Sequence, residues 1–132
     1  MTNPFTYFKG SLTSDFDHLN IDKENPLRAC PNSPNCVRIT VEQNENSDQL
    51  FKQLFHTLNE MNVYEVNSNT NTQKIDAVFR IPIFGFKDDV TFQIEEADSK
   101  SFLHIRSASR VGYGDLGVNR RRVQRILTLL HK

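Results

Sequence analysis

Apolar residues recur at the three- and four-residue spacing of a helix in two parts of the chain. The first part begins at Ser47, a favourable N-cap residue, and extends to Met61. The second begins near Val118 or Asn119 and runs to the end of the chain. Their apolar positions are Leu50, Phe51, Leu54, Phe55 and Leu58 in the first part, and Val123, Ile126, Leu127 and Leu130 in the second. Both patterns predict amphipathic helices.

Between these helices the period shortens to two residues, which is the spacing of a strand with one buried face. Four segments show it, at residues 63–68, 73–81, 87–95 and 102–107. The connections between them are short, so we expect hairpins and a four-stranded antiparallel meander. The order helix, four strands, helix predicts a two-layer α+β domain with both helices packed on the sheet.

The first 28 residues show no sustained period of either kind, although they contain isolated aromatic residues. We therefore expect an extended N-terminal arm over residues 1–28 and a single domain over residues 29–132. No apolar stretch is long enough to span a membrane, and the first residues lack the pattern of a secretory signal. These features predict a soluble, cytoplasmic protein.

The chain has 16 basic and 16 acidic residues, but their distribution is uneven. Basic residues gather between Arg106 and Lys132, where Asp115 is the single acid. Such a segment suits either an anionic ligand or pairing with the chain's own carboxylates. Nucleic acid is not expected as a partner, because the basic residues are not interleaved with aromatic residues and the chain is neutral overall.

The segment at 106–122, which joins the last predicted strand to the last helix, carries the most candidate chemistry. Its glycines permit close backbone approach, and the helix N-terminus that follows favours an anion. Its arginines add forked donors for a phosphate or carboxylate. We therefore predict a site for a small anion or an anionic head group, formed by Arg106, Ser107, Ser109, Arg110, Tyr113, Asp115, Asn119 and Arg120.

A neighbouring connection supplies further candidates and an alternative. Phe84 and Phe86 flank a glycine, and they either fold onto the core or form an apolar rim of the predicted site. Asp88 and Asp89 are adjacent on a strand and point to opposite faces, so they are not a same-side pair of catalytic carboxylates. In the alternative interpretation, the arginines pair with Asp76, Asp88 and Asp89, and the domain serves structure or protein interaction.

A hydrolase is a second alternative, because Ser107 or Ser109 could act as a nucleophile with His104. However, Ser107 and His104 differ in strand parity, and no nucleophile elbow surrounds either serine. The sequence therefore favours a non-enzymatic binding module. It indicates no cofactor and identifies no protein partner.

Cys30 and Cys36 enclose a short loop that contains two prolines. A disulfide can bridge this spacing if the loop folds back, whereas in a reducing compartment the pair would remain thiols. The histidines are dispersed and no further cysteine accompanies the pair, so we expect no metal site.

Three sequence blocks together resemble the signature of one protein family. They are Cys-Pro-Asn-Ser-Pro-Asn-Cys-Val at 30–37, Phe-Gly-Phe-Lys-Asp-Asp-Val-Thr-Phe at 84–92, and Arg-Ser-Ala-Ser-Arg-Val-Gly-Tyr-Gly-Asp-Leu-Gly-Val-Asn-Arg-Arg-Arg-Val at 106–123. Their order resembles the domain-of-unknown-function family DUF1499, found in bacteria and plastids, over about residues 30–127. The resemblance implies a small single-domain protein without an established reaction, whose relatives are often exported.

Overall fold

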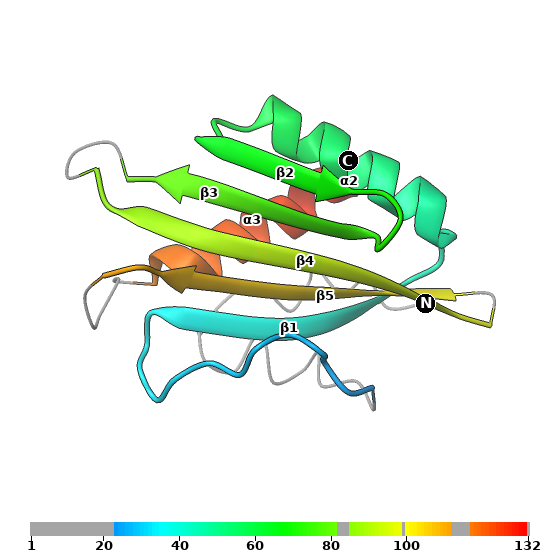
Figure 1. Ribbon diagram of the computed structural model, residues 1–132, viewed down its shortest axis with the longest axis horizontal. Coiled ribbons are helices and arrows are strands. Elements are labelled where there is room, and N and C mark those ends of the chain that lie inside the picture. Colours follow the sequence, from blue (N-terminus) through cyan, green and yellow to red (C-terminus); the bar gives the residue numbers. More distant parts are fainter. Residues whose placement is uncertain (1–22, 82–84, 99, 112–116, 132) are drawn as a thin grey trace.

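The computed structural model describes residues 23–81, 85–98, 100–111 and 117–131. They form a five-stranded antiparallel sheet with two helices on one of its faces (Figure 1). The strands are β1 (Cys36–Gln43), β2 (Glu65–Asn69), β3 (Lys74–Arg80), β4 (Lys87–Ala97) and β5 (Lys100–Ser109), and the helices are α2 (Ser47–Glu60) and α3 (Val118–Leu130). The predicted α+β class is therefore confirmed. Neither helix has the length and apolar character needed to cross a membrane, and this holds for all residues that the structure describes.

The prediction of four strands is wrong, because residues 36–43 form a further strand. The strand order is β1-β5-β4-β3-β2, so the predicted meander runs from β2 to β5, and β1 adds to its free edge. The buried residues Val37, Ile39 and Val41 alternate along β1, so the two-residue period is present in the sequence. Turn-forming residues precede this strand and its partner lies far along the chain, so no hairpin signal marks it.

Local capping sets where the helices begin. The N-cap of α2 is Asn46 rather than the predicted Ser47, because the Asn46 side-chain oxygen accepts a hydrogen bond from the Gln49 backbone N–H at 2.9 Å. The α3 helix begins at Val118, as predicted. Gly117 precedes it with φ of 79°, a left-handed conformation that glycine adopts without steric cost.

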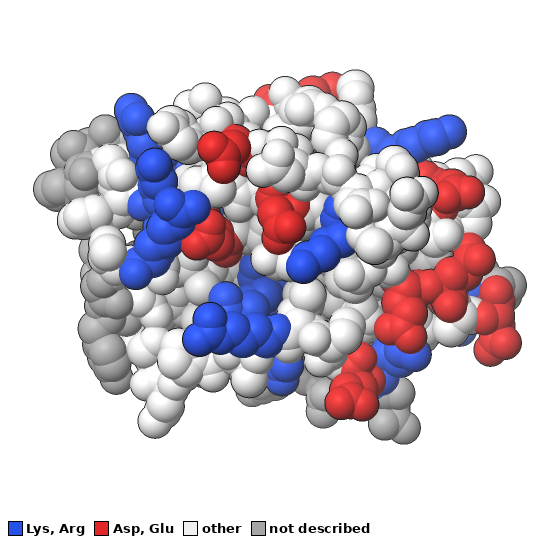
Figure 2. All heavy atoms as spheres, in the orientation of Figure 1, with Lys and Arg blue, Asp and Glu red and all other residues white. Residues whose placement is uncertain are grey.

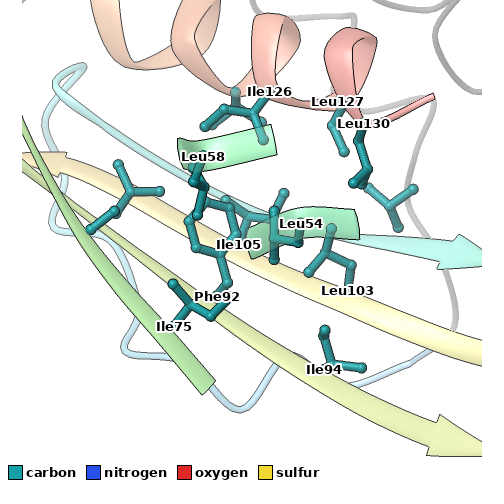
Figure 3. Close-up of a cluster of buried hydrophobic side chains, with 14 of the residues drawn as sticks. Leu54, Leu58, Ile75, Phe92, Ile94, Leu103, Ile105, Ile126, Leu127 and Leu130 are labelled. Atoms are coloured by element: carbon teal, nitrogen blue, oxygen red, sulfur yellow. The ribbon is translucent and has the colours of Figure 1, made fainter. Parts of the chain in front are cut away.

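The hydrophobic core lies between the sheet and the two helices (Figure 3). Helix α3 packs on β5 and β1, and α2 packs on β4 and β5. The labelled core residues are Leu54, Leu58, Ile126, Leu127 and Leu130 of the helices and Ile75, Phe92, Ile94, Leu103 and Ile105 of the sheet. We call the sheet face on which α2 and α3 pack the inner face, and the opposite face the outer face.

The described part of the predicted N-terminal arm contacts the sheet. Asn25 donates its side-chain N–H to the Ile39 carbonyl of β1 at 2.9 Å. The carbonyls of Leu27 and Arg28 accept from arginine side chains of β1 and β5, each at 2.9 Å. Residues 23–28 therefore lie against the sheet, beside its β1 edge.

Candidate functional site

Strand alternation separates the residues of the predicted anion site. Arg106 lies on the outer face of β5, whereas Ser107 and Ser109 lie on the inner face beneath α3. Arg120 lies in the first turn of α3 and forms no ion pair with the residues that the structure describes. Phe86 is 49% exposed, so it does not fold onto the core. The predicted residues Phe84, Tyr113 and Asp115 lie outside the described residues.

On the inner face, two serines and an asparagine form a buried network between β5 and α3. Ser107 Oγ donates to Asn119 Oδ1 at 2.6 Å. Asn119 Nδ2 donates to Ser109 Oγ at 2.9 Å and to the Asn35 carbonyl at 3.1 Å. Because these groups bond to one another away from solvent, they fasten α3 and the loop before β1 to the sheet.

A buried ion pair lies beside this network. Arg122 Nη1 donates to Asp88 Oδ2 at 2.6 Å, and the guanidinium carbon lies 4.8 Å from the centroid of the Phe79 ring. Asp88 is fully buried and the Arg122 side chain is 11% exposed. Arg122 is not among the site residues predicted from the sequence. Its spacing of three from Asn119 places it on the same side of the helix, which is the signal that could have found it.

The neighbouring carboxylate, Asp89, points to the outer face as predicted. Arg110 binds it with both fork nitrogens, Nε to Oδ2 and Nη2 to Oδ1, each at 2.9 Å. These hydrogen bonds to Asp89 raise the pKa of Arg110. The guanidinium of Arg110 is therefore matched by a carboxylate of the chain itself, and as an exposed pair it adds little stability.

Three arginines meet on the outer face, near the end of the sheet where β1 begins and β5 ends. Arg38 of β1 lies directly opposite Arg106 of β5, and Arg28 joins them because its carbonyl accepts from Arg106 Nε. We call Arg28, Arg38 and Arg106 the arginine cluster. Burial lowers the pKa of Arg106, and the positive charges of Arg28 and Arg38 lower it further.

No carboxylate forms an ion pair with the arginine cluster within the described part of the chain. Asp89 acts on Arg106 only as a nearby charge, since both of its oxygens bind Arg110. Like charges placed opposite each other across two strands are destabilising. The repulsion within the cluster is therefore not balanced by an ion pair among the described residues.

Next to the arginine cluster, the outer face holds a row of polar side chains across the sheet. Thr40 Oγ1 lies 2.8 Å from His104 Nδ1, and His104 Nε2 lies 3.0 Å from Glu95 Oε1. Lys23 Nζ then binds Glu95 Oε2 at 2.6 Å. His104 is fully buried within this row, on the face opposite Ser107. The serine and the histidine of the hydrolase alternative therefore do not form a pair.

This row makes folding depend on pH. Burial lowers the pKa of His104 more than the Glu95 carboxylate raises it. The unfolded chain therefore takes up a proton near the ordinary histidine value of about 6.5, while the folded chain keeps His104 neutral. Hydrogen bonds from Lys23 and His104 lower the pKa of Glu95 in the folded chain. The contribution of His104 is thus complete above about pH 6.5 and is lost on acidification, and that of Glu95 is lost at lower pH.

Cys30 and Cys36 form a disulfide in this structure. It closes the loop that ends at Asn35, whose carbonyl accepts from Asn119 Nδ2 and from the Ser109 backbone N–H. The disulfide therefore holds the segment that connects β1 to the buried network.

A cavity of about 550 Å³, which the sequence pattern does not predict, lies between α2 and the turn that joins β2 to β3. Phe51 and Phe55 form its apolar wall, and Asp48, Lys52 and Gln73 add polar groups of mixed character. Its lining residues come from α2 and from the β2–β3 turn, and no sequence pattern links these two segments. The cavity lies apart from the arginine cluster, which is on the other face of the sheet.

These observations define a small α+β protein in which one sheet face is covered by helices and the other carries a group of arginines without carboxylate partners among the described residues. A family model described as "Protein of unknown function (DUF1499)" matches residues 26–130. The chain therefore belongs to this family, and the resemblance of the three sequence blocks is confirmed. No curated protein matches the chain.

Proposed function

We propose that this protein is a non-enzymatic binding module for a small anion or an anionic head group, which is received by the arginine cluster. The observation that carries the proposal is the cross-strand pair of Arg38 and Arg106, with Arg28 beside it. None of the three arginines forms an ion pair with a carboxylate of the described residues. A guanidinium offers planar forked donors that match a phosphate or carboxylate. A bound anion would also oppose the repulsion from Arg28 and Arg38, which adds to burial in lowering the pKa of Arg106.

This proposal places the ligand on the outer face rather than in the whole 106–122 segment. Ser107, Ser109 and Asn119 already satisfy one another on the inner face, and Arg110 is held by Asp89. Of the predicted residues on β5, Arg106 retains nitrogens without partners among the described residues. The scaffold alternative accounts for Arg110, for the buried ion pair and for the bonds from Arg38 and Arg106 to the Leu27 and Arg28 carbonyls, but it supplies no negative charge to balance the cluster.

Thermal unfolding, followed by circular dichroism, tests the proposal. Phosphate, sulfate and citrate are titrated at constant ionic strength, with chloride as the balancing anion. An anion that binds, at a free concentration 100 times its dissociation constant, stabilises the folded chain by about 2.7 kcal/mol. This raises the melting temperature by several degrees. The double variant Arg38→Gln with Arg106→Gln should lose this shift.

The matched control is Arg125→Gln, which removes an exposed arginine of α3 away from the sheet. It should keep the full shift. The proposal is overturned if none of the anions raises the melting temperature above the chloride baseline, or if the control loses as much of the shift as the double variant.

A further inference from the structure

Large hydrophobic side chains are exposed at one end of the sheet. Tyr64, Phe86 and Val111 are 50%, 49% and 54% exposed, and they are the large hydrophobic residues exposed in the described part of the chain. Single exposed hydrophobic residues are ordinary on a protein surface, whereas several gathered at one place mark an interaction site. Their shared position therefore calls for a partner.

The sheet topology brings these three residues together. Tyr64 precedes β2 and donates its backbone N–H to Val78 of β3. The carbonyl of Phe86, just before β4, accepts from the Ile81 backbone N–H beyond the end of β3. Val111 follows β5, whose end is joined to the start of β4 by a hydrogen bond from the Arg110 N–H to the Lys87 carbonyl. In this antiparallel sheet the start of β2, the end of β3, the start of β4 and the end of β5 all lie at the same end of the sheet (Figure 1).

Cations accompany the hydrophobic residues. The Tyr64 ring has Arg80 at 5.3 Å and Lys87 at 4.7 Å from its centroid, and neither cation forms an ion pair with a described carboxylate. We call Tyr64, Arg80, Phe86, Lys87 and Val111 the aromatic-basic end. Figure 2 shows Lys and Arg side chains at the left of the view, with acidic side chains among them, and further acidic side chains at the lower right.

Glu42, Glu95 and Glu96 lie toward the opposite end of the sheet, where β1 and β4 end. Arg80 and Lys87, which form no ion pair with a described carboxylate, would therefore orient the molecule with its aromatic-basic end toward an anionic surface. Tyrosine, with an apolar ring and a polar hydroxyl, suits the boundary between lipid and water, and nearby cations suit anionic head groups.

We propose that the aromatic-basic end docks on the surface of an anionic lipid bilayer, with Phe86 and Val111 entering the head-group boundary and Arg80 and Lys87 meeting lipid phosphates. A nucleic acid would supply phosphates but no apolar phase for Val111. A protein partner would need a broader apolar face than the three exposed residues described at this end of the sheet. The proposal uses none of the arginine cluster, so it can fail while the proposed anion site stands.

Co-sedimentation of the full chain with vesicles tests the proposal. The vesicles contain phosphatidylcholine alone or with about one-third phosphatidylglycerol. The chain should bind the anionic vesicles and not the neutral ones. Removing both cations, as Arg80→Gln with Lys87→Gln, should weaken binding roughly 25-fold, since each cation near the membrane contributes about fivefold. Phe86→Ser with Val111→Ser should weaken it at least tenfold, because less apolar surface is buried.

The matched control is Lys52→Gln with Arg125→Gln, which removes two exposed cations from the helices and should leave vesicle binding unchanged. Circular dichroism confirms that each variant is folded. The proposal is overturned if anionic vesicles fail to sediment the chain, or if the serine variant binds as tightly as the natural chain. It is also overturned if only Arg38→Gln with Arg106→Gln releases the vesicles, or if a DNA duplex is bound in preference to them.

Discussion

Replacing Arg122 with methionine tests how the fold tolerates a carboxylate in its interior. Among the described residues, Asp88 accepts its hydrogen bond from Arg122 alone, at 2.6 Å, and its second oxygen has no partner. The substitution leaves a fully buried carboxylate unpaired, which costs about 3–5 kcal/mol. Loss of the guanidinium above the Phe79 ring adds about 1 kcal/mol. Methionine keeps an unbranched stem, so most of the apolar packing survives.

Urea unfolding followed by circular dichroism measures this cost, because the chain has no tryptophan. With a denaturant slope of about 1.5 kcal/mol/M, a loss of about 4 kcal/mol in the free energy of unfolding lowers the urea midpoint by roughly 2–3 M. Arg125→Met makes the same change at an exposed position of the same helix. It should alter the free energy of unfolding by less than about 0.5 kcal/mol.

A double variant separates the unpaired charge from lost packing. Asp88→Leu with Arg122→Met removes both charges, so this double variant should lose less stability than Arg122→Met alone. If Arg122→Met prevents folding, a folded double variant still demonstrates the coupling. The reasoning is refuted if the single variant costs less than about 1 kcal/mol, or if the double variant is less stable than the single one.

Three further predictions concern the remaining contacts. Folding stability, from urea midpoints in a pH series, should fall between pH 7 and 5, and His104→Gln should flatten this fall; a slope equal to that of the natural chain would contradict the assignment. Cys30→Ser with Cys36→Ser should lower the free energy of unfolding by about 2 kcal/mol through loop-closure entropy, and an unchanged midpoint would show that the disulfide does not constrain the unfolded chain. Asn119→Ala should cost about 2–4 kcal/mol in thermal unfolding, since it strips buried partners of their bonds, and a loss below about 1 kcal/mol would show that the network is dispensable.

Local periodicity was sufficient to predict both helices and the meander, because each of these elements shows its buried face within a few turns or residues. The alternation of Ile75, Ala77 and Phe79 on β3 is an example. β1 shows the same alternation, but it pairs with β5 far along the chain, and no short connection announces that pairing. Expectations that depend on local spacing therefore succeeded, and the strand count, which depends on distant pairing, did not.

The candidate site follows the same division. The sequence identified Arg106 as a candidate, yet Arg28 and Arg38 become its neighbours only when β1 lies beside β5. The contact between Asn119 and the Asn35 carbonyl likewise joins residues 84 positions apart. Residue types predicted that the segment would bind polar groups, but the fold decides which groups face inward and which face the solvent.

The arrangement of Arg38 opposite Arg106 yields a final prediction, in which stability and binding move in opposite directions. Arg38→Glu places a carboxylate directly across from Arg106 and so replaces a repulsive cross-strand pair with an attractive one. Without added anion the variant should be as stable as the natural chain or more stable by up to about 1 kcal/mol, and phosphate should no longer raise its melting temperature. If the variant is instead destabilised by more than about 1 kcal/mol, the bond from Arg38 to the Leu27 carbonyl dominates, and the cluster serves to fasten residues 23–28 to the sheet. If the natural chain is less stable than the Arg38→Glu variant, the like charges of Arg38 and Arg106 serve ligand binding rather than folding stability.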